Sequence, residues 1–224
     1  MPGREPASVS PFATRFDARM LDAAGAALLA VIHAPVRGRP RGPLVVLPPW
    51  GEEENRSRAL LAALARRLAG AGIAVSLLNL SGTGESWPAI PPSDPRQWAA
   101  ELAQAGAALS RLTGAAGPPA LLACRRMAGM LRERLLALLP RDAFDPVLLW
   151  DPLPAGAPAA AEPLAPPFWA RGPGASPRRA AVRTLRSPDK AGRIWTGREG
   201  RVDAELVAAM AARIAARLDR RAAS

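Results

Sequence analysis

The stretch SLLNLSGTGES, residues 76–86, decides the fold of this chain. A short apolar strand ends in a polar residue, and two glycines then turn the chain before a serine. Glycine adopts the positive φ angles of tight turns at little cost. Short, continuously apolar strands are typical of parallel sheets that carry helices on both faces. The stretch therefore predicts a buried parallel strand whose carboxyl end opens into a polar turn.

Strands and helices alternate around this stretch. Apolar runs predict strands at 26–33, 44–47, 73–78, 119–124 and 147–150, with weaker ones at 180–185 and 193–196. Helical spacing of leucines or small residues predicts helices over 52–70, 94–112, 128–139 and 203–218. This alternation favours right-handed βαβ crossovers. We therefore expect an α/β fold with a doubly wound, mostly parallel sheet that is shortened in its C-terminal third.

The two ends of the alternating region predict the domain organisation. Residues 1–24 are expected to form a loose leader, because three prolines among the first eleven residues oppose regular structure. Residues 25–224 are then expected to form a single α/β domain. Within it, the Pro, Ala and Gly of residues 152–179 predict a long loop or a small lid.

The charge of the chain is strongly positive without being concentrated. The 224 residues include 30 Lys and Arg and carry a net charge of +11. Only Lys190 is a lysine, and the arginines are spread along the chain in pairs. Nucleic-acid binders usually cluster their basic residues on one face or helix. We therefore expect no dedicated nucleic-acid binding, although the excess charge favours small anionic partners.

Cysteine, histidine and apolar runs limit the remaining possibilities. One Cys and one His predict neither a disulfide nor a metal site, and no cofactor is expected. No apolar run reaches the roughly 18 residues of a membrane span. Charged residues interrupt the N-terminal segment, so no signal peptide is expected and the predicted location is cytoplasmic. The oligomeric state stays open.

Four segments are expected to meet at one end of the sheet. In open α/β sheets, ligands bind beyond the carboxyl ends of the strands. Residues 48–53, 79–86, 124–128 and 150–153 each follow a predicted parallel strand. This topology predicts the place of a site but not its chemistry.

Several of these segments resemble one protein family. LPPWGEEENRSR at residues 47–58 resembles the segment after the third strand in exosortase A system-associated hydrolases. Those bacterial relatives of the α/β hydrolases are encoded with exopolysaccharide and protein-sorting genes. Residues 79–86, LLWDP at 148–152 and RIWT at 193–196 are similar to them too. The resemblance implies an α/β-hydrolase fold and an ester or acyl hydrolase-like activity in an exopolysaccharide system.

The segment LLACRRMAG, residues 121–129, is where a hydrolase of this class has its nucleophile elbow, Gly-x-Ser-x-Gly. Laid on that pattern, Cys124 takes the first glycine, Arg126 the serine and Ala128 the last glycine. A guanidinium stays protonated and cannot attack a carbonyl. The resemblance implies that one subgroup of the family also has Arg at this position.

The other members of a Ser, acid, His triad are equally hard to find. The only histidine, His33, lies far upstream of the position that the triad order requires. Asp151 follows a strand and stands near the acid position, or it binds nearby backbone or an arginine. A thiol pair of Cys124 with His33 is disfavoured, since both positions suit packed strand residues. We therefore expect a degenerate triad.

Two functions stay open for the predicted site. One is a hydrolase-like enzyme with an acyl or ester substrate, and the other is an inert α/β-hydrolase fold that binds an anionic ligand or a protein. Arg126 is expected either to bind a carboxylate or phosphate or to pair with an internal acid. The serines and threonine of residues 79–86 are expected to bond the turn itself. The candidate ligand-binding residues are Trp50, Gly51, Glu52, Glu53, Arg125, Arg126 and Trp150.

Overall fold

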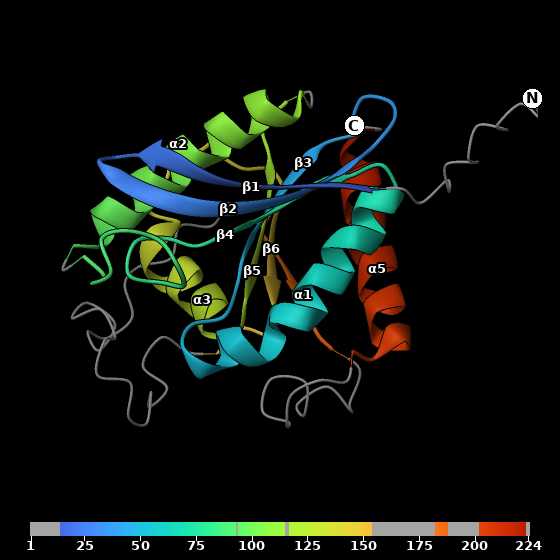
Figure 1. Ribbon diagram of the computed structural model, residues 1–224. Coiled ribbons are helices and arrows are strands. Elements are labelled where there is room, and N and C mark those ends of the chain that lie inside the picture. The colour runs from blue at the N-terminus through green and yellow to red at the C-terminus, as the bar shows by residue number, and fades with distance from the viewer. Residues whose placement is uncertain (1–13, 93, 115–116, 154–181, 188–201, 223–224) are drawn as a thin grey trace, which may run out of the picture.

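Within the described residues, seven strands form one sheet in the order β1-β2-β4-β3-β5-β6-β7. The computed structural model in Figure 1 describes residues 14–92, 94–114, 117–153, 182–187 and 202–222. The strands are β1 (Thr14–Ala23), β2 (Ala26–Pro35), β3 (Pro43–Leu47), β4 (Ala74–Leu78), β5 (Ala120–Cys124), β6 (Val147–Trp150) and β7 (Val182–Leu185). The helices are α1 (Glu52–Gly70), α2 (Pro95–Thr113), α3 (Arg125–Met130), the π-helical turn η1 (Leu131–Leu135) and α5 (Ala204–Ala222).

The sheet is mostly parallel, as the sequence predicts. Strands β4, β3, β5, β6 and β7 pair in parallel, and only β2 runs against both of its neighbours. Helices cover both faces: α1 and α5 lie together on one side, and α2 and α3 lie on the other (Figure 1). The fold is therefore the predicted doubly wound α/β arrangement.

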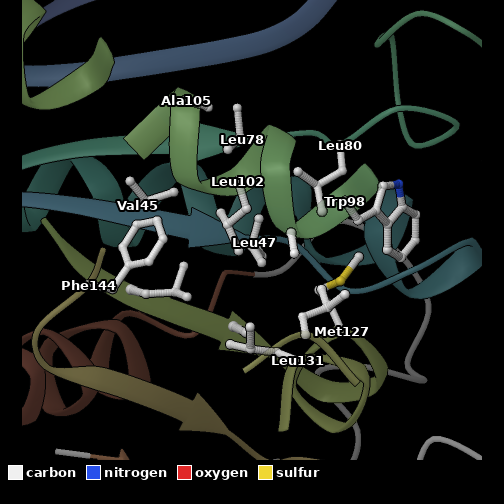
Figure 2. Close-up of a cluster of buried hydrophobic side chains, with 14 of the residues drawn as sticks. Val45, Leu47, Leu78, Leu80, Trp98, Leu102, Ala105, Met127, Leu131 and Phe144 are labelled. Atoms are coloured by element: carbon white, nitrogen blue, oxygen red, sulfur yellow. The ribbon is translucent and has the colours of Figure 1, made fainter. Parts of the chain in front are cut away.

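Each buried strand contributes side chains to two hydrophobic cores, one on each face of the sheet. In β3, Val45 and Leu47 pack with α2 and α3, whereas Leu44 and Val46 pack with α1 and α5. Figure 2 shows the first of these cores, in which Trp98 of α2 is fully buried. Successive side chains of a strand point to opposite faces, so a strand covered on both sides must be apolar throughout.

The predicted helix starts are confirmed by their caps. Asp94 precedes α2, and its Oδ1 accepts a hydrogen bond from the Arg96 amide at 2.9 Å. Asp203 precedes α5, and its Oδ1 accepts from the amides of Glu205 and Leu206 at 3.0 Å each. Such carboxylates bond amide groups that the first helical turn leaves without partners.

The predicted leader is wrong over residues 14–23, which form β1. The three prolines that argue against regular structure all precede Thr14. Ala24 and Gly25 have φ angles of 51° and 79° and make a two-residue turn that joins β1 to β2. Residues 1–13, most of the predicted lid at 152–179 and the predicted strand at 193–196 lie outside the described residues.

Candidate functional site

The segments that follow β3, β4 and β5 meet at one end of the sheet, where the first turn of α1 contacts two of them. Glu54 Oε1 accepts a hydrogen bond from Asn79 Nδ2 at 2.6 Å. The neighbouring Glu53 accepts from Arg125 at 3.2 Å. The segment after β6 joins them, because the Leu153 amide donates to the Arg125 carbonyl at 3.2 Å. The predicted convergence is therefore present.

The strand-to-helix turn at residues 124–126, here called the elbow turn, has its strained residue at Arg125. The φ angle of Arg125 is 52°, directly between the end of β5 and the first turn of α3. Non-glycine residues rarely adopt this region, and such strain gathers at functional turns. In a nucleophile elbow the serine sits on the strained turn. The positive φ thus lies at Arg125, one residue before Arg126, the residue that the sequence pattern places at the serine position.

Arg125 forms an internal ion pair. Its Nη2 lies 3.2 Å from Glu53 Oε1, and the side chains are only 16% and 14% exposed. This low exposure reduces the screening by water that weakens surface pairs. The internal Arg–Glu bridge that the sequence left open therefore forms, but through Arg125 instead of Arg126.

Arg126, the next residue, has a different environment. Its Nε and Nη1 atoms are buried, and the structure gives them no hydrogen-bond partner among the described residues. Buried polar groups in folded proteins nearly always have a partner, in the protein or from solvent. Arg126 is therefore the cationic group of the elbow turn that is open to an external acceptor.

Asp151 lies at the end of β6 and bonds Ser187. The Ser187 amide donates to Asp151 Oδ1 at 2.9 Å, and the Ser187 hydroxyl donates to Oδ2. Trp150 Nε1 in turn donates to Ser187 Oγ at 2.8 Å. Sequence reasoning missed Ser187, because it lies 36 positions after Asp151 in the sequence. The carboxylate therefore binds nearby backbone and a hydroxyl, the alternative to a triad acid.

The other candidate residues after β3 and β6 are mostly structural. Trp50 and Trp150 are 4% and 0% exposed, and the ring of Trp50 packs on Trp98 with centroids 5.6 Å apart. Gly51 has a φ of 68° and precedes α1. Glu52 is exposed and lies 3.8 Å from Arg56. Of the predicted ligand-binding set, the structure brings Glu53 and Arg125 into direct contact.

The turn at residues 79–86, here called the glycine turn, encloses a buried carboxyl. A Cβ on Gly84 would lie 2.2 Å from Asn79 Nδ2 and 2.9 Å from Glu54 Oε1, so only glycine fits there. Burial raises the pKa of Glu54, and the Asn79 hydrogen bond and the Arg58 charge oppose that rise. The glycine turn thus packs directly over the Glu54–Asn79 pair.

A second buried carboxyl, Glu101 of α2, holds the middle of the glycine turn. It accepts from the Ser81 amide at 3.0 Å and from the Ser81 hydroxyl at 2.6 Å, and it is 0% exposed. The Ser86 hydroxyl donates to the Asn79 carbonyl at 2.8 Å. The Ser86 hydroxyl therefore bonds the turn, as predicted, whereas the Ser81 hydroxyl bonds α2 instead. Sequence reasoning missed Glu101, because a Glu in mid-helix usually faces solvent.

Cys124 and His33 do not form a pair. Burial raises the pKa of the Cys124 thiol far above its ordinary range, and the charges of Asp151 and Glu53 add to that rise. His33 lies on β2, and β4 and β3 separate that strand from β5. Its ring meets the ring of Phe16 at 5.4 Å, and burial lowers its pKa. The thiol is therefore inert, and the imidazole lies away from the elbow turn.

Metal-binding clusters and membrane-spanning helices are absent from the described part of the chain. No three His, Cys, Asp or Glu side chains gather there in a way that could hold a metal ion. None of the described helices combines the length and apolar character that crossing a membrane requires.

Comparisons with known proteins concern the fold. No protein-family model matches the chain, and no curated protein does. A hypothetical protein from Pseudomonas aeruginosa is similar in structure, with 18% identity, a TM-score of 0.51, and 62% of this chain and 43% of that one covered. A candidate alpha/beta hydrolase from Nostoc sp PCC 7120 has 23% identity and a TM-score of 0.46, with coverages of 62% and 44%. Epoxide hydrolase A from Mycobacterium thermoresistibile has 24% identity and a TM-score of 0.42, with coverages of 61% and 39%.

This chain thus matches about two fifths of the length of each of these structures. At such identities the likeness concerns the fold and not the reaction. The strand order and the two helical layers agree with the similarity to the Pseudomonas aeruginosa structure. The chain has an α/β fold with a mostly parallel, doubly wound sheet.

Proposed function

We propose that this chain is an α/β-hydrolase-like protein of an exosortase and exopolysaccharide system that does not hydrolyse esters through a Ser-His-Asp triad. One observation carries the chemical part: the strained residue after β5 is Arg125, and its guanidinium is paired with Glu53. A guanidinium that remains protonated offers no nucleophile. The link to the exosortase system is supported by sequence resemblance alone, in residues 47–58, 79–86, 148–152 and 193–196.

The position of the only histidine supports the same proposal. A triad needs an imidazole within hydrogen-bond reach of the nucleophile. His33 belongs to β2, which lies three places from β5 in the sheet, and its ring faces Phe16. Asp151 is bonded to Ser187 instead of to an imidazole. Neither a general base nor its orienting acid stands beside Arg125 among these residues.

A panel of short-chain esters and acyl substrates tests the proposal. We expect purified protein to give no turnover above the buffer rate, and Arg125→Ala to leave that result unchanged. The matched control is Arg141→Ala, an exposed arginine outside the elbow turn. Turnover by the wild type and Arg141→Ala that Arg125→Ala abolishes would contradict it. Flanking genes without an exosortase or polysaccharide-assembly function would contradict the assignment to that system.

A second candidate function is the binding of a small anion by an inert fold, and Arg126 favours it. Its Nε and Nη1 atoms are buried without a partner among the described residues. A carboxylate or phosphate would supply the missing acceptors and neutralise the charge. Glu53 binds Arg125 through Oε1, and among the described residues no ion pair joins Glu53 to Arg126.

Thermal unfolding in the presence of phosphate or acetate tests this second function. A ligand that binds only the folded state raises the melting temperature. We expect phosphate to raise Tm in wild type and in the control Arg141→Ala, and to raise it less in Arg126→Ala. Equal shifts in all three proteins would show that the anion acts elsewhere and would overturn this function.

A further inference from the structure

The outer edge of β1 has no strand beside it among the described residues. β1 pairs with β2 on one side over ten consecutive residue pairs without a bulge. Natural proteins protect long edge strands with prolines, bulges or covering segments, because open edges recruit other strands. The strand TRFDARMLDA contains neither proline nor glycine. β1 is therefore long and regular enough to accept a further strand.

The hydrogen bonds of β2 show which groups of β1 point to the open edge. The Ala27 amide and carbonyl bond Trp87, and the Leu29 carbonyl accepts from the Asn79 amide, all on the side away from β1. Ala27 lies opposite Asp22, and Leu29 lies opposite Met20. In an antiparallel pair, residues opposite such positions also bond outward. The even-numbered residues of β1 therefore direct their amides and carbonyls to the open edge.

The sequence of β1 is complementary to itself about Ala18. When two copies of the strand run antiparallel with Ala18 on the two-fold axis, Phe16 lies opposite Met20 of the second copy. Asp17 then lies opposite Arg19 of the second copy. Phe16 and Met20 are 65% and 52% exposed and share one face, and a thioether packs favourably on an aromatic ring. Asp17 and Arg19 share the other face, with side chains 43% and 52% exposed.

Neighbouring registers are excluded by charge. A shift of the two-fold axis to residue 17 places Asp17 opposite Asp17, and a shift to residue 19 places Arg19 opposite Arg19. Like charges directly opposite each other in a sheet are destabilising. A shift to a point between two residues would set outward-bonding residues against inward-bonding ones. Of the axes at residues 17, 18 and 19, only the one at Ala18 satisfies the charges and the backbone together.

We propose that β1 is the interface of a symmetric homodimer, in which the β1 strands of two copies pair antiparallel about Ala18 and continue the sheet across the molecule. The two-fold arrangement is isologous, so each copy offers the same surface. It would form about ten main-chain hydrogen bonds between the even-numbered residues. The occupant of the edge is thus a second copy of this chain, and this inference does not depend on the proposed function.

A charge exchange tests the pairing by sedimentation or light scattering. Wild type is expected to form a species of twice the 23.5 kDa chain mass. Asp17→Arg is expected to raise the dimer dissociation constant at least about tenfold, because two opposite-charge pairs become repulsive. The double variant Asp17→Arg with Arg19→Asp restores opposite charges and is expected to restore the dimer. The exposed Asp142→Arg makes the same charge change elsewhere and should leave the dimer intact.

Cysteine cross-linking tests the register. Residues directly opposite in a hydrogen-bonded pair have Cα atoms about 5.5 Å apart, which suits a disulfide. Ala18→Cys is therefore expected to form a covalent dimer on oxidation, and the buried native Cys124 does not interfere. Asp22→Cys is expected to stay unlinked, since eight residues of strand, about 27 Å, separate the two copies of that position.

Three outcomes would overturn the proposal. The first is a wild type that remains monomeric, with the Ala18 amide protected from deuterium exchange by another part of its own chain. The second is a dimer that Asp17→Arg does not weaken. The third is cross-linking of Asp22→Cys in preference to Ala18→Cys. The substituted side chains are at least partly exposed, so we expect each variant to fold. Circular dichroism of each variant checks this.

Discussion

The glycine turn and the elbow turn lie at the same end of the sheet, but they differ in how their buried polar groups are hydrogen-bonded. In the glycine turn, Ser81 donates two hydrogen bonds to Glu101, and Asn79 donates one to Glu54. In the elbow turn, Arg125 is held at a positive φ, and two nitrogen atoms of Arg126 lack a partner among the described residues. Satisfied buried networks stiffen a scaffold, whereas an unsatisfied group marks a place for a ligand. The more hydrolase-like of the two turns in sequence is thus the structural one.

Two adjacent residues of α1 connect the turns. Glu53 reaches Arg125, and Glu54 reaches Asn79. The first contact joins two ions, whereas the second joins a carboxyl to a neutral amide. Glu54 Oε1 also lies 3.8 Å from Arg58 Nη2, but the Arg58 side chain is 55% exposed, so water screens its charge. An ion pair stabilises the charged carboxylate, but an amide only partly offsets the cost of burying it. One helical turn therefore carries a carboxylate in an ion pair with Arg125 beside one whose charged form burial disfavours.

The largest expected effect comes from breaking the glycine turn with Gly82→Ala. Gly82 has a φ of 73°, and an added Cβ would lie 2.2 Å from the backbone nitrogen of Pro91. The strain and the overlap together should lower the free energy of unfolding by roughly 3 kcal/mol. Urea unfolding of the purified variant measures this loss.

Gly38→Ala is the matched control for that substitution. Gly38 has a φ of 78°, but nothing lies within 4 Å of an added Cβ. Only the backbone preference is lost, so we expect a decrease of about 1 kcal/mol. Equal losses in the two variants would mean that the glycine turn is not packed tightly against Pro91, and the contrast with the elbow turn would weaken.

The fold was predictable because its signals are local. The apolar strands, the leucine spacing of α1 and the caps Asp94 and Asp203 each depend on residues close together in sequence. β1 was missed because its outward face is exposed, so its residues show no buried pattern, and the prolines before it suggested a loose segment. Edge strands of this kind are defined by the partner strand and not by their own periodicity.

The site was less predictable because tertiary contacts define it. The elbow pattern lacks both glycines, so the sequence gives no signal that the positive φ lies at Arg125 and not at Arg126. The choice of Glu53 as its partner depends on how α1 lies against β5. Glu101 looked like a solvent-facing helix residue, but the Ser81 amide and hydroxyl stabilise it in the interior.

The smallest expected effect is that of Glu54→Gln, which compares Glu54 with the neighbouring Glu53. Glu54→Gln keeps an acceptor for Asn79 and removes the charge that burial disfavours. At pH 8 we expect the free energy of unfolding to rise by an amount on the order of 1 kcal/mol. Glu53→Gln is the control, and it should lower the free energy of unfolding by a similar amount, because the ion pair with Arg125 loses a charge.

The free energy of unfolding of Glu54→Gln, compared with that of wild type, should also depend on pH in a definite direction. The pKa of Glu54 is raised in the folded state, so the folded protein binds a proton more tightly there than the unfolded chain does. The stability from this group is fully present below the ordinary pKa of 4.5 and is lost as pH rises through the raised folded value. Burial lowers the pKa of His33, whose contribution instead falls as pH drops below its ordinary 6.5. The difference between wild type and Glu54→Gln cancels the His33 contribution, so the advantage of the variant should grow as pH rises from 4 to 8. A difference that stays constant over that range would mean that Glu54 is ionised at no cost, and that the glycine turn tolerates charge as readily as the elbow turn does.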